Sequence, residues 1–375
     1  MQNIKRKINF FYHNFNRTIL KNISKKLQND LWINGKFVNI LEKKLEKFLR
    51  TNKKVSTCNS GSDALLLALL LDKHPKKNIY LTTPFSYLAS SSIAKFLKLE
   101  VVYIDVSKDN YLLDLDKLEF FLEKCPLKIR EKIRGVINVE IFGSTNNLAK
   151  LNKIAKKYKL SLIGDCAQSF GTKYKKKFSI NYYDYSTISF YPTKIYSCYG
   201  DGGAIVVNKN KLHKSILLKN NGHEFHNKDN CKVLGINSRL DNIQAYILNE
   251  NLKKINLTIK KRNDNFNLLK KNNPSFLKLP IFDKNIDSNN YIYSVYINNK
   301  MRNQFIKHMK NNKIQCVVFY KKLLSQNLIL KPIIKNKLTN AIHCSKSLVC
   351  IPSHENITKK EILKISKIIS NFKFK

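Results

Sequence analysis

The chain has 375 residues, of which 43% are hydrophobic, and this is enough for a sizeable core shared by one large domain and a smaller one. Its formal net charge of +43 comes from lysines scattered through every segment, with only eight arginines, a distribution that argues against a specific nucleic-acid binder. No apolar run is long enough for a signal peptide or a membrane span. We therefore expect a cytoplasmic protein with no membrane span and no specific nucleic-acid partner, whose charge attracts anionic substrates.

Residues 1 to about 50 are expected to be helical, with a turn at residues 32–37. Beyond them, short apolar runs alternate with segments of helical periodicity. The expected strands are residues 79–82, 101–105, 135–142, 160–165, 185–190 and 203–207, and the expected helices are residues 62–71, 87–97, 114–123 and 148–158. One long helix, or two in series, is expected from residue 239 to about residue 269, then a strand at 291–297 and helices at 305–309 and 359–369.

This alternation predicts an α/β fold with a mostly parallel central sheet and helices on both faces. Residues 51–255 are expected to form this large domain. Residues 1–50 and 256–375 are expected to supply the N-terminal helices and a smaller C-terminal α+β domain. The eight cysteines include no C-x-x-C pair, so no metal site is expected.

One lysine has an unusual setting. Lys194 ends the stretch Ser-Phe-Tyr-Pro-Thr-Lys at residues 189–194, between two apolar runs, and a glycine cluster follows at residues 200–204. Burial in such a turn lowers the pKa of an amine and makes it nucleophilic. The hypothesis to test against the rest of the chain is that Lys194 forms a Schiff base with pyridoxal phosphate.

A turn that suits a phosphate precedes the first apolar helix, at residues 58–65. Gly61 and Ser62 open this helix, where free backbone N–H groups form a ready anion site. Ser189 offers a hydroxyl to the same anion. Taken alone, an ordinary helix with Ser62 as its N-cap explains the same residues.

Three further residues suit a flat, nitrogen-containing ring. Asp165 ends an apolar strand and, if buried, needs a cationic partner such as a pyridinium nitrogen. Gln168, three residues on, is within reach of a ring oxygen. Tyr87 follows a strand, at the edge of the sheet where ligand sites form, and its ring suits stacking. Taken alone, Asp165 is equally well explained as a carboxylate that caps the next turn, and Tyr87 as an aromatic residue of the core.

A polar turn at residues 235–245 leads into the long helix. Asn237 offers an amide there, and Arg239 offers a guanidinium suited to anions. A helix cap with an exposed arginine is the alternative explanation for these two residues.

Taken in order, these motifs resemble the fold-type-I pyridoxal-phosphate aminotransferases, specifically the sugar-aminotransferase family named after DegT, DnrJ and StrS. The resemblance runs from Gly35–Val38 and Glu42, through the motifs above, to Ile351–His354, and so covers nearly the whole chain. It implies that Lys194 holds the cofactor, Asp165 pairs with the pyridine nitrogen, Gln168 with the ring oxygen, and Tyr87 stacks on the ring. Gly61, Ser62 and Ser189 would hold the phosphate.

The resemblance also implies partners. Asn237 would reach the phosphate of a neighbouring subunit, which requires a homodimer with shared active sites. The reaction would move an amino group from an amino acid, most often glutamate, to a keto sugar nucleotide, with the 3-keto branch the most similar. Tyr320 lies in the nearest counterpart of a segment that contacts substrate in this family, and Arg239 is the other substrate candidate.

Two other classes of function remain open. One is a non-catalytic regulatory protein on the same fold, since fold does not fix function. The other is an anion-binding or nucleic-acid-binding protein, suggested only by the charge. The joint presence of Lys194, Asp165 and Gln168 favours an enzyme.

Overall fold

A seven-stranded sheet organises most of the chain in the computed structural model, which describes residues 6–12, 15–225, 227 and 229–373. Its strand order is β1-β9-β8-β5-β4-β2-β3. The strands are β1 (Lys54–Cys58), β2 (Ile79–Thr82), β3 (Glu100–Tyr103), β4 (Ile133–Val139), β5 (Ser161–Asp165), β8 (Tyr185–Ser189) and β9 (Gly203–Val207). Six strands run in one direction, and β9 alone in the opposite one. The prediction of an α/β fold with a mostly parallel sheet is confirmed.

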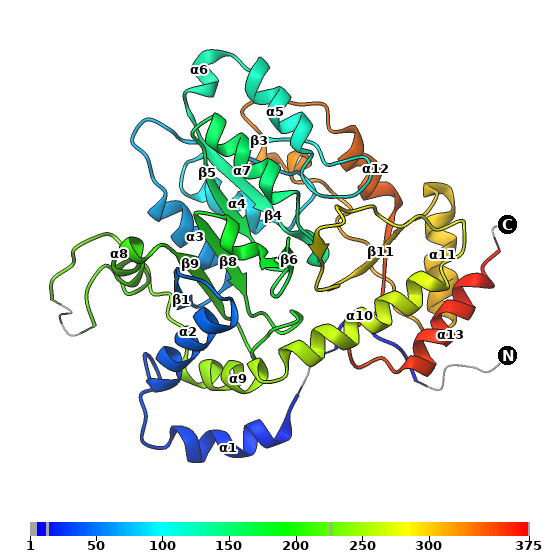
Figure 1. Cartoon of the computed structure of the whole chain (residues 1–375), viewed down its shortest axis with the longest axis horizontal. Helices are drawn as coiled ribbons and strands as arrows, with labels where there is room; N and C mark the ends of the chain where they lie inside the picture. The colour runs from blue at the N-terminus through cyan, green and yellow to red at the C-terminus, as the bar shows by residue number, and fades with distance from the viewer. Residues whose placement is uncertain (1–5, 13–14, 226, 228, 374–375) are drawn as a thin grey trace.

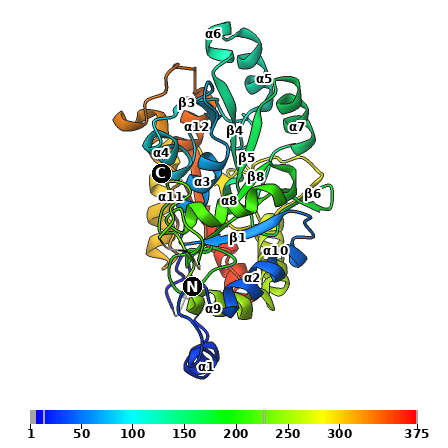
Figure 2. The same cartoon turned by 90° about the vertical axis from the view of Figure 1, so that its left-hand side faces the viewer.

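Helices cover both faces of this sheet (Figures 1 and 2). Consecutive strand residues point to opposite faces, so Val136 and Leu162 join one apolar cluster while Ile137 and Ile163 join the other. The first cluster includes α2 (Lys36–Phe48), α5 (Leu115–Lys124), α7 (Leu148–Lys157) and α9 (Asn242–Leu252). The second includes α3 (Gly61–Leu71), α4 (Ala89–Phe96) and α8 (Lys209–Lys219). A short α6 (Leu127–Arg130) links α5 to β4.

The C-terminal part of the chain builds a second core around a two-stranded antiparallel sheet. Its elements are α10 (Ile255–Lys271), β11 (Tyr293–Tyr296), α11 (Asn299–Asn311), α12 (Thr339–Ser347), β12 (Leu348–Ile351) and α13 (Lys359–Ser370). Helix α13 begins with a capping box between Thr358 and Glu361 and lies beside α10 (Figure 1). Its isoleucines at 362, 365 and 369 recur on one face, which buries them in this core.

The N-terminal residues divide their contacts between these two cores. Helix α1 (Arg17–Leu27) packs on α9, and Leu41 and Leu45 of α2 lie in the core of the seven-stranded sheet. Ile8, in contrast, joins the C-terminal core. The proposed division into residues 51–255 and residues 1–50 with 256–375 stays a prediction, but contacts place α2 beside the larger sheet.

The sequence located most elements and missed others. Residues 79–82 form the expected strand, and the long helix is two helices in series, α9 and α10. The strand expected at residues 135–142 ends at Val139, because Ile141–Gly143 forms a 3-10 turn in which Phe142 has a φ of 56°. Strands β1 and β12 and helices α8 and α12 were not predicted. Nor were the two-residue strands β6 (Lys173–Tyr174), β7 (Lys177–Phe178) and β10 (Ile286–Asp287).

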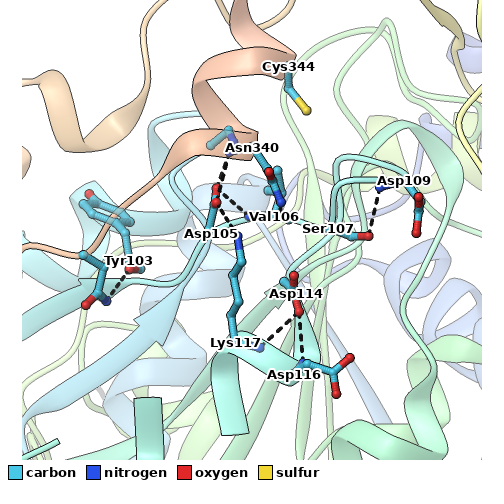
Figure 3. Close-up of polar contacts among 12 residues, drawn as sticks. Tyr103, Asp105, Val106, Ser107, Asp109, Asp114, Asp116, Lys117, Asn340 and Cys344 are labelled. Atoms are coloured by element: carbon cyan, nitrogen blue, oxygen red, sulfur yellow. Dashed lines mark hydrogen bonds and ion pairs between the residues drawn. The ribbon is translucent and has the colours of Figure 1, made fainter. Parts of the chain in front are cut away.

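The connection that leads into α12 is fastened to the edge of the large sheet. Asp105, 2% exposed, follows β3, and its carboxylate accepts the backbone N–H groups of Asn340 at 3.0 Å and Ala341 at 2.8 Å. Lys117 donates to the same carboxylate at 2.7 Å (Figure 3). A carboxylate at the first turn of a helix offsets its unpaired N–H groups and its dipole. Asp105 therefore holds α12, and the segment before it, against the large sheet.

Candidate active site

A cavity of about 490 Å³ opens at the carboxyl ends of β4, β5 and β8. This is the edge at which open α/β sheets bind ligands, and the volume suits a small organic molecule. Of the residues predicted to bind cofactor or substrate, those that line the cavity are Gly61, Ser62, Tyr87, Asp165, Gln168, Ser189, Lys194 and Tyr320. Eight of the ten predicted residues, from motifs far apart in the chain, therefore line one cavity.

The phosphate turn is built on the first residues of α3. Ser60, and not Ser62, is the N-cap, because its Oγ accepts the N–H of Asp63 at 3.0 Å. The first N–H groups of a helix, here those of Gly61 and Ser62, have no partner within the helix. Ser189 lies directly beside them, since a Cβ placed on Gly61 would come 2.7 Å from Ser189 Cβ. Two N–H donors and a hydroxyl thus meet at a helix N-terminus, the donor set that suits a phosphate.

Asp165 ends β5 and is 6% exposed. Ser90 Oγ donates to its Oδ2 at 2.7 Å, and the N–H of Ala167 donates to its Oδ1 at 3.3 Å. Burial raises the pKa of Asp165, against the opposing effects of these hydrogen bonds and of the charge of Lys194. A buried carboxylate of this kind favours a cationic partner, and a pyridinium nitrogen fits that requirement.

Lys194 lies in the turn after β8, where its N–H donates to the carbonyl of Tyr191 at 2.8 Å. Its Nζ lies 5.4 Å from the centre of the Tyr291 ring, in a cation–π contact. None of the ion pairs found among the described residues uses Lys194. The amine is therefore held at the cavity wall by an aromatic ring and is free of a carboxylate that would occupy it.

Gln168 and Tyr320 contact each other in the cavity wall. Gln168 Oε1 accepts the N–H of Phe142 at 2.8 Å, and its Nε2 donates to the Tyr320 hydroxyl at 3.2 Å. The Tyr320 ring meets Phe85 edge to face, with centres 5.6 Å apart. Burial raises the pKa of Tyr320 well above its usual value. Because an amide nitrogen has two N–H donors, the predicted contact of Gln168 with a ring oxygen is compatible with its hydrogen bond to Tyr320.

Asn237 and Arg239 do not line the cavity of this chain. Asn237 is exposed, and Arg239 Nη1 donates to Asn220 Oδ1 at 3.0 Å. Between them, Ser238 accepts the N–H of Asn59 at 3.2 Å and donates to Asp63 at 2.8 Å. The polar turn is thus tied to the phosphate turn of its own chain, while Asn237 faces outward.

Sequence reasoning missed several lining residues, among them Phe11, Glu140, Phe142 and Tyr291. Phe142 and Tyr291 belong to apolar runs that indicate only a buried strand. Glu140 is a single charged residue in an apolar run, and this was the one sequence pattern that could have indicated a site residue. No pattern in the sequence marks Phe11.

The described residues hold no helix that is both long and apolar enough to cross a membrane. Nor do they bring three or more His, Cys, Asp or Glu side chains together as a metal site would. The lining offers anion donors, the Lys194 amine and the carboxylates of Glu140, Asp165 and Asp201 as its chemical groups.

Comparison with known proteins agrees with this geometry. A family model described as the DegT/DnrJ/EryC1/StrS aminotransferase family matches residues 14–370. A Pseudomonas aeruginosa protein, UDP-2-acetamido-2-deoxy-3-oxo-D-glucuronate aminotransferase, is 34% identical over 227 residues, which span 60% of each chain. A Campylobacter jejuni protein, UDP-4-amino-4,6-dideoxy-N-acetyl-beta-L-altrosamine transaminase, is 26% identical over 94% of each chain. The crystal structure of an aminotransferase of this family from Brucella abortus superposes with a TM-score of 0.87, at 26% identity, over 95% of each chain.

Proposed function

The chain belongs to the DegT/DnrJ/EryC1/StrS aminotransferase family, and we propose that it transfers the amino group of an amino acid to a keto sugar nucleotide, with pyridoxal phosphate as cofactor. The observation that carries this proposal is the meeting of Lys194, Asp165 and the phosphate turn at Gly61 and Ser62 in one cavity. The donor is proposed to be glutamate. A 3-keto substrate is favoured, because the Pseudomonas relative is named for a 3-oxo sugar.

The lining supplies each contact that such a cofactor requires. Gly61, Ser62 and Ser189 would bind its phosphate, and Asp165 would pair with its ring nitrogen. Tyr87, 60% exposed at the cavity wall, would cover one face of the ring. The bound cofactor supplies an electron sink for the electron pair released at the amino donor's α-carbon.

Lys194 has two tasks in this proposal. Its Nζ would be the attachment point of the cofactor. Once freed, the same Nζ would accept the proton of the donor's α-carbon and later give that proton back. An amine that moves protons near neutral pH must be free of a tight carboxylate partner. The contact of Lys194 with the Tyr291 ring would hold the amine at the cavity wall without an ion pair to a carboxylate.

Substrate binding is assigned to Tyr320 in the cavity wall. Its ring suits a sugar because one end of a tyrosine is apolar and the other hydrogen-bonds. The net charge of +43 would speed the approach of an anionic nucleotide at low salt. Arg239 would contribute only if a neighbouring subunit brings it to the site.

We further propose that the active unit is a homodimer. Asn237 is exposed and lies beside the phosphate turn without contacting the cavity of its own chain, which supports a role in the site of a second copy. Two-fold symmetry would place two such residues in equivalent positions. The described cysteines are all unpaired, which supports a reducing compartment such as the cytoplasm.

A panel of keto sugar nucleotides incubated with glutamate and pyridoxal phosphate tests the proposed reaction. Mass spectrometry should detect one aminated sugar nucleotide, together with 2-oxoglutarate. The Lys194→Ala variant should yield neither product. A wild-type protein that binds pyridoxal phosphate but aminates none of the 3-keto or 4-keto compounds would contradict the assigned substrate class and favour the non-catalytic alternative.

A further inference from the structure

Glu140 is a fully buried carboxylate at the wall of the cavity, with no role in the chemistry above. It follows β4, beside the end of β5, and its backbone N–H donates to the carbonyl of Asp165 at 3.0 Å. Glu140 therefore lies at the same edge of the sheet as Asp165. A charge at such a buried position requires hydrogen-bond partners that stabilise it.

Four hydroxyl groups donate to this one carboxylate. Thr145 and Tyr183 donate to Oε1, at 2.5 Å and 2.7 Å. Ser179 donates to Oε2 at 2.7 Å, and Ser169 donates to the same oxygen. Since a carboxylate accepts about four hydrogen bonds, these donors saturate it.

This arrangement differs from that of two other buried acids, Asp72 and Asp105. Asp72 and Asp105 each have a cation as partner, Arg134 and Lys117 respectively. Glu140 takes part in none of the ion pairs found among the described residues and depends on neutral donors alone. Burying a carboxylate without a cation is costly, so a purely structural role is a poor explanation when an apolar residue would fill the space.

The four donors come from three segments that meet in the folded chain. Ser169 ends the turn that begins at Asp165, Thr145 follows β4, and Ser179 and Tyr183 precede β8. The ends of the turn are also held by backbone hydrogen bonds: Cys166 N–H donates to the Thr187 carbonyl at 3.0 Å, and Thr172 N–H donates to the Ser169 carbonyl at 2.8 Å. The bond from Ser169 to Glu140 is the side-chain link between this turn and the buried carboxylate.

We propose that Glu140 is a positioning residue, which fixes the turn from Asp165 to Ser169 through Ser169 and thereby places the Asp165 carboxylate and the Gln168 amide for the cofactor's pyridine ring. The identity of that ring rests on the proposed function. The fixing of the turn is a property of this chain with or without the cofactor.

Ser169→Ala and Ser179→Ala form a matched pair for the test. Both serines are 2% exposed, and both donate to Oε2 of Glu140. Each variant loses one hydroxyl bond to the same oxygen, so both should lose similar thermal stability. Only Ser169 belongs to the turn with Asp165 and Gln168.

Titration of the apoprotein with pyridoxal phosphate gives the first readout. The dissociation constant should rise about tenfold in Ser169→Ala, as expected when a hydrogen bond to a charged group is lost, and change less than about threefold in Ser179→Ala. Glu140→Gln, which keeps the size of the side chain, should resemble Ser169→Ala. Equal dissociation constants in the two serine variants would overturn the proposal.

Hydrogen exchange of the apoproteins gives a second readout that needs no cofactor. The amides of residues 166–169 should exchange faster in Ser169→Ala and Glu140→Gln than in Ser179→Ala. If the wild type binds no pyridoxal phosphate, the proposed function fails, whereas the exchange rates still decide whether Glu140 fixes the turn. Unchanged exchange in Ser169→Ala would refute that role.

Discussion

Gly61 and Ser189 lie so close that a Cβ on Gly61 would come 2.7 Å from Ser189 Cβ and 3.1 Å from Ser189 Oγ. One residue opens α3 and the other ends β8, and they are 128 positions apart in the sequence (189 − 61). This contact brings a hydroxyl to the N-terminus of a helix. It is the structural basis for assigning the phosphate of the cofactor to this corner of the cavity.

Gly61→Ala should weaken the binding of pyridoxal phosphate about tenfold or more, because the added methyl group must push Ser189 away from the anion site. Fluorescence titration of the apoprotein measures this. The matched control is Gly200→Ala, where the nearest atom to an added Cβ is the flexible Gln244 Nε2 at 3.1 Å. Affinity that is unchanged in Gly61→Ala, or equally reduced in the control, would argue against a phosphate at this turn.

Asp165→Asn should make the apoprotein no less stable at pH 7, while activity falls by about 100-fold or more. Burial raises the pKa of Asp165, so the native state holds a proton that the unfolded chain has released. Stability therefore falls as pH rises from about 3.9, the usual value for Asp, through the raised pKa. The side chain of the Asp165→Asn variant does not titrate, so the variant does not lose stability over this pH range.

Urea unfolding of both apoproteins from pH 4 to pH 8 measures the difference in stability, which should vanish toward pH 4. Ser90→Ala is the control for activity. It removes the 2.7 Å hydrogen bond to the carboxylate, and a 2.8 Å bond to the Ser86 hydroxyl, but leaves the carboxylate itself in place, so it should cost less than tenfold. An Asp165→Asn variant that is fully active would show that this carboxylate does not serve the cofactor.

His354→Gln should remove part of the acid sensitivity of the fold. Burial, together with the charge of Arg262, lowers the pKa of His354 to about 4, below the value of about 6.5 expected in the unfolded chain. The native state then binds fewer protons between these values. The contribution of His354 to the free energy of unfolding should fall by about 3 kcal/mol as pH falls from 6.5 to 4.

The same unfolding experiment tests this prediction with His213→Gln as control, since the His213 side chain is exposed. The wild type and His213→Gln should show the same slope between pH 6.5 and 4, and His354→Gln a shallower one. Because His354 stacks on Tyr12 and lies 3.2 Å from the Asn9 carbonyl, acid should also loosen the N-terminal residues that include Phe11 of the cavity. Identical slopes in all three proteins would show that His354 does not titrate as its burial suggests.

The sequence predicted those parts of the site that depend on short stretches of chain. A strand that ends in Asp165, a Gly-Ser turn before an apolar helix, and a lysine in a Pro-containing turn each have a local pattern. The mutual arrangement of Glu140, Ser169 and Ser179 has none, because the donors of one carboxylate come from separate segments. The same applies to the hydrogen bond of Gln168 to Tyr320, which joins residues 152 positions apart.

The missed elements have physical reasons as well. Strand β1 begins with a lysine and continues with serine and threonine, so its burial between β9 and α2 leaves little trace in its composition. Helix α8 buries Lys219, whose Nζ donates to the carbonyl of Thr57 at 2.7 Å. A buried lysine breaks the polar and apolar pattern from which a helix is predicted.

The most direct test of the account is to reduce the protein with borohydride in the presence of pyridoxal phosphate and to map the labelled residue by peptide mass spectrometry. The peptide that contains Lys194 should carry the cofactor in the wild type, and Lys194→Ala should carry none. Lys219, the buried lysine behind the phosphate turn, is an internal control and should stay unlabelled. A label on Lys219 or another lysine, or no label at saturating cofactor, would contradict the assignment of Lys194.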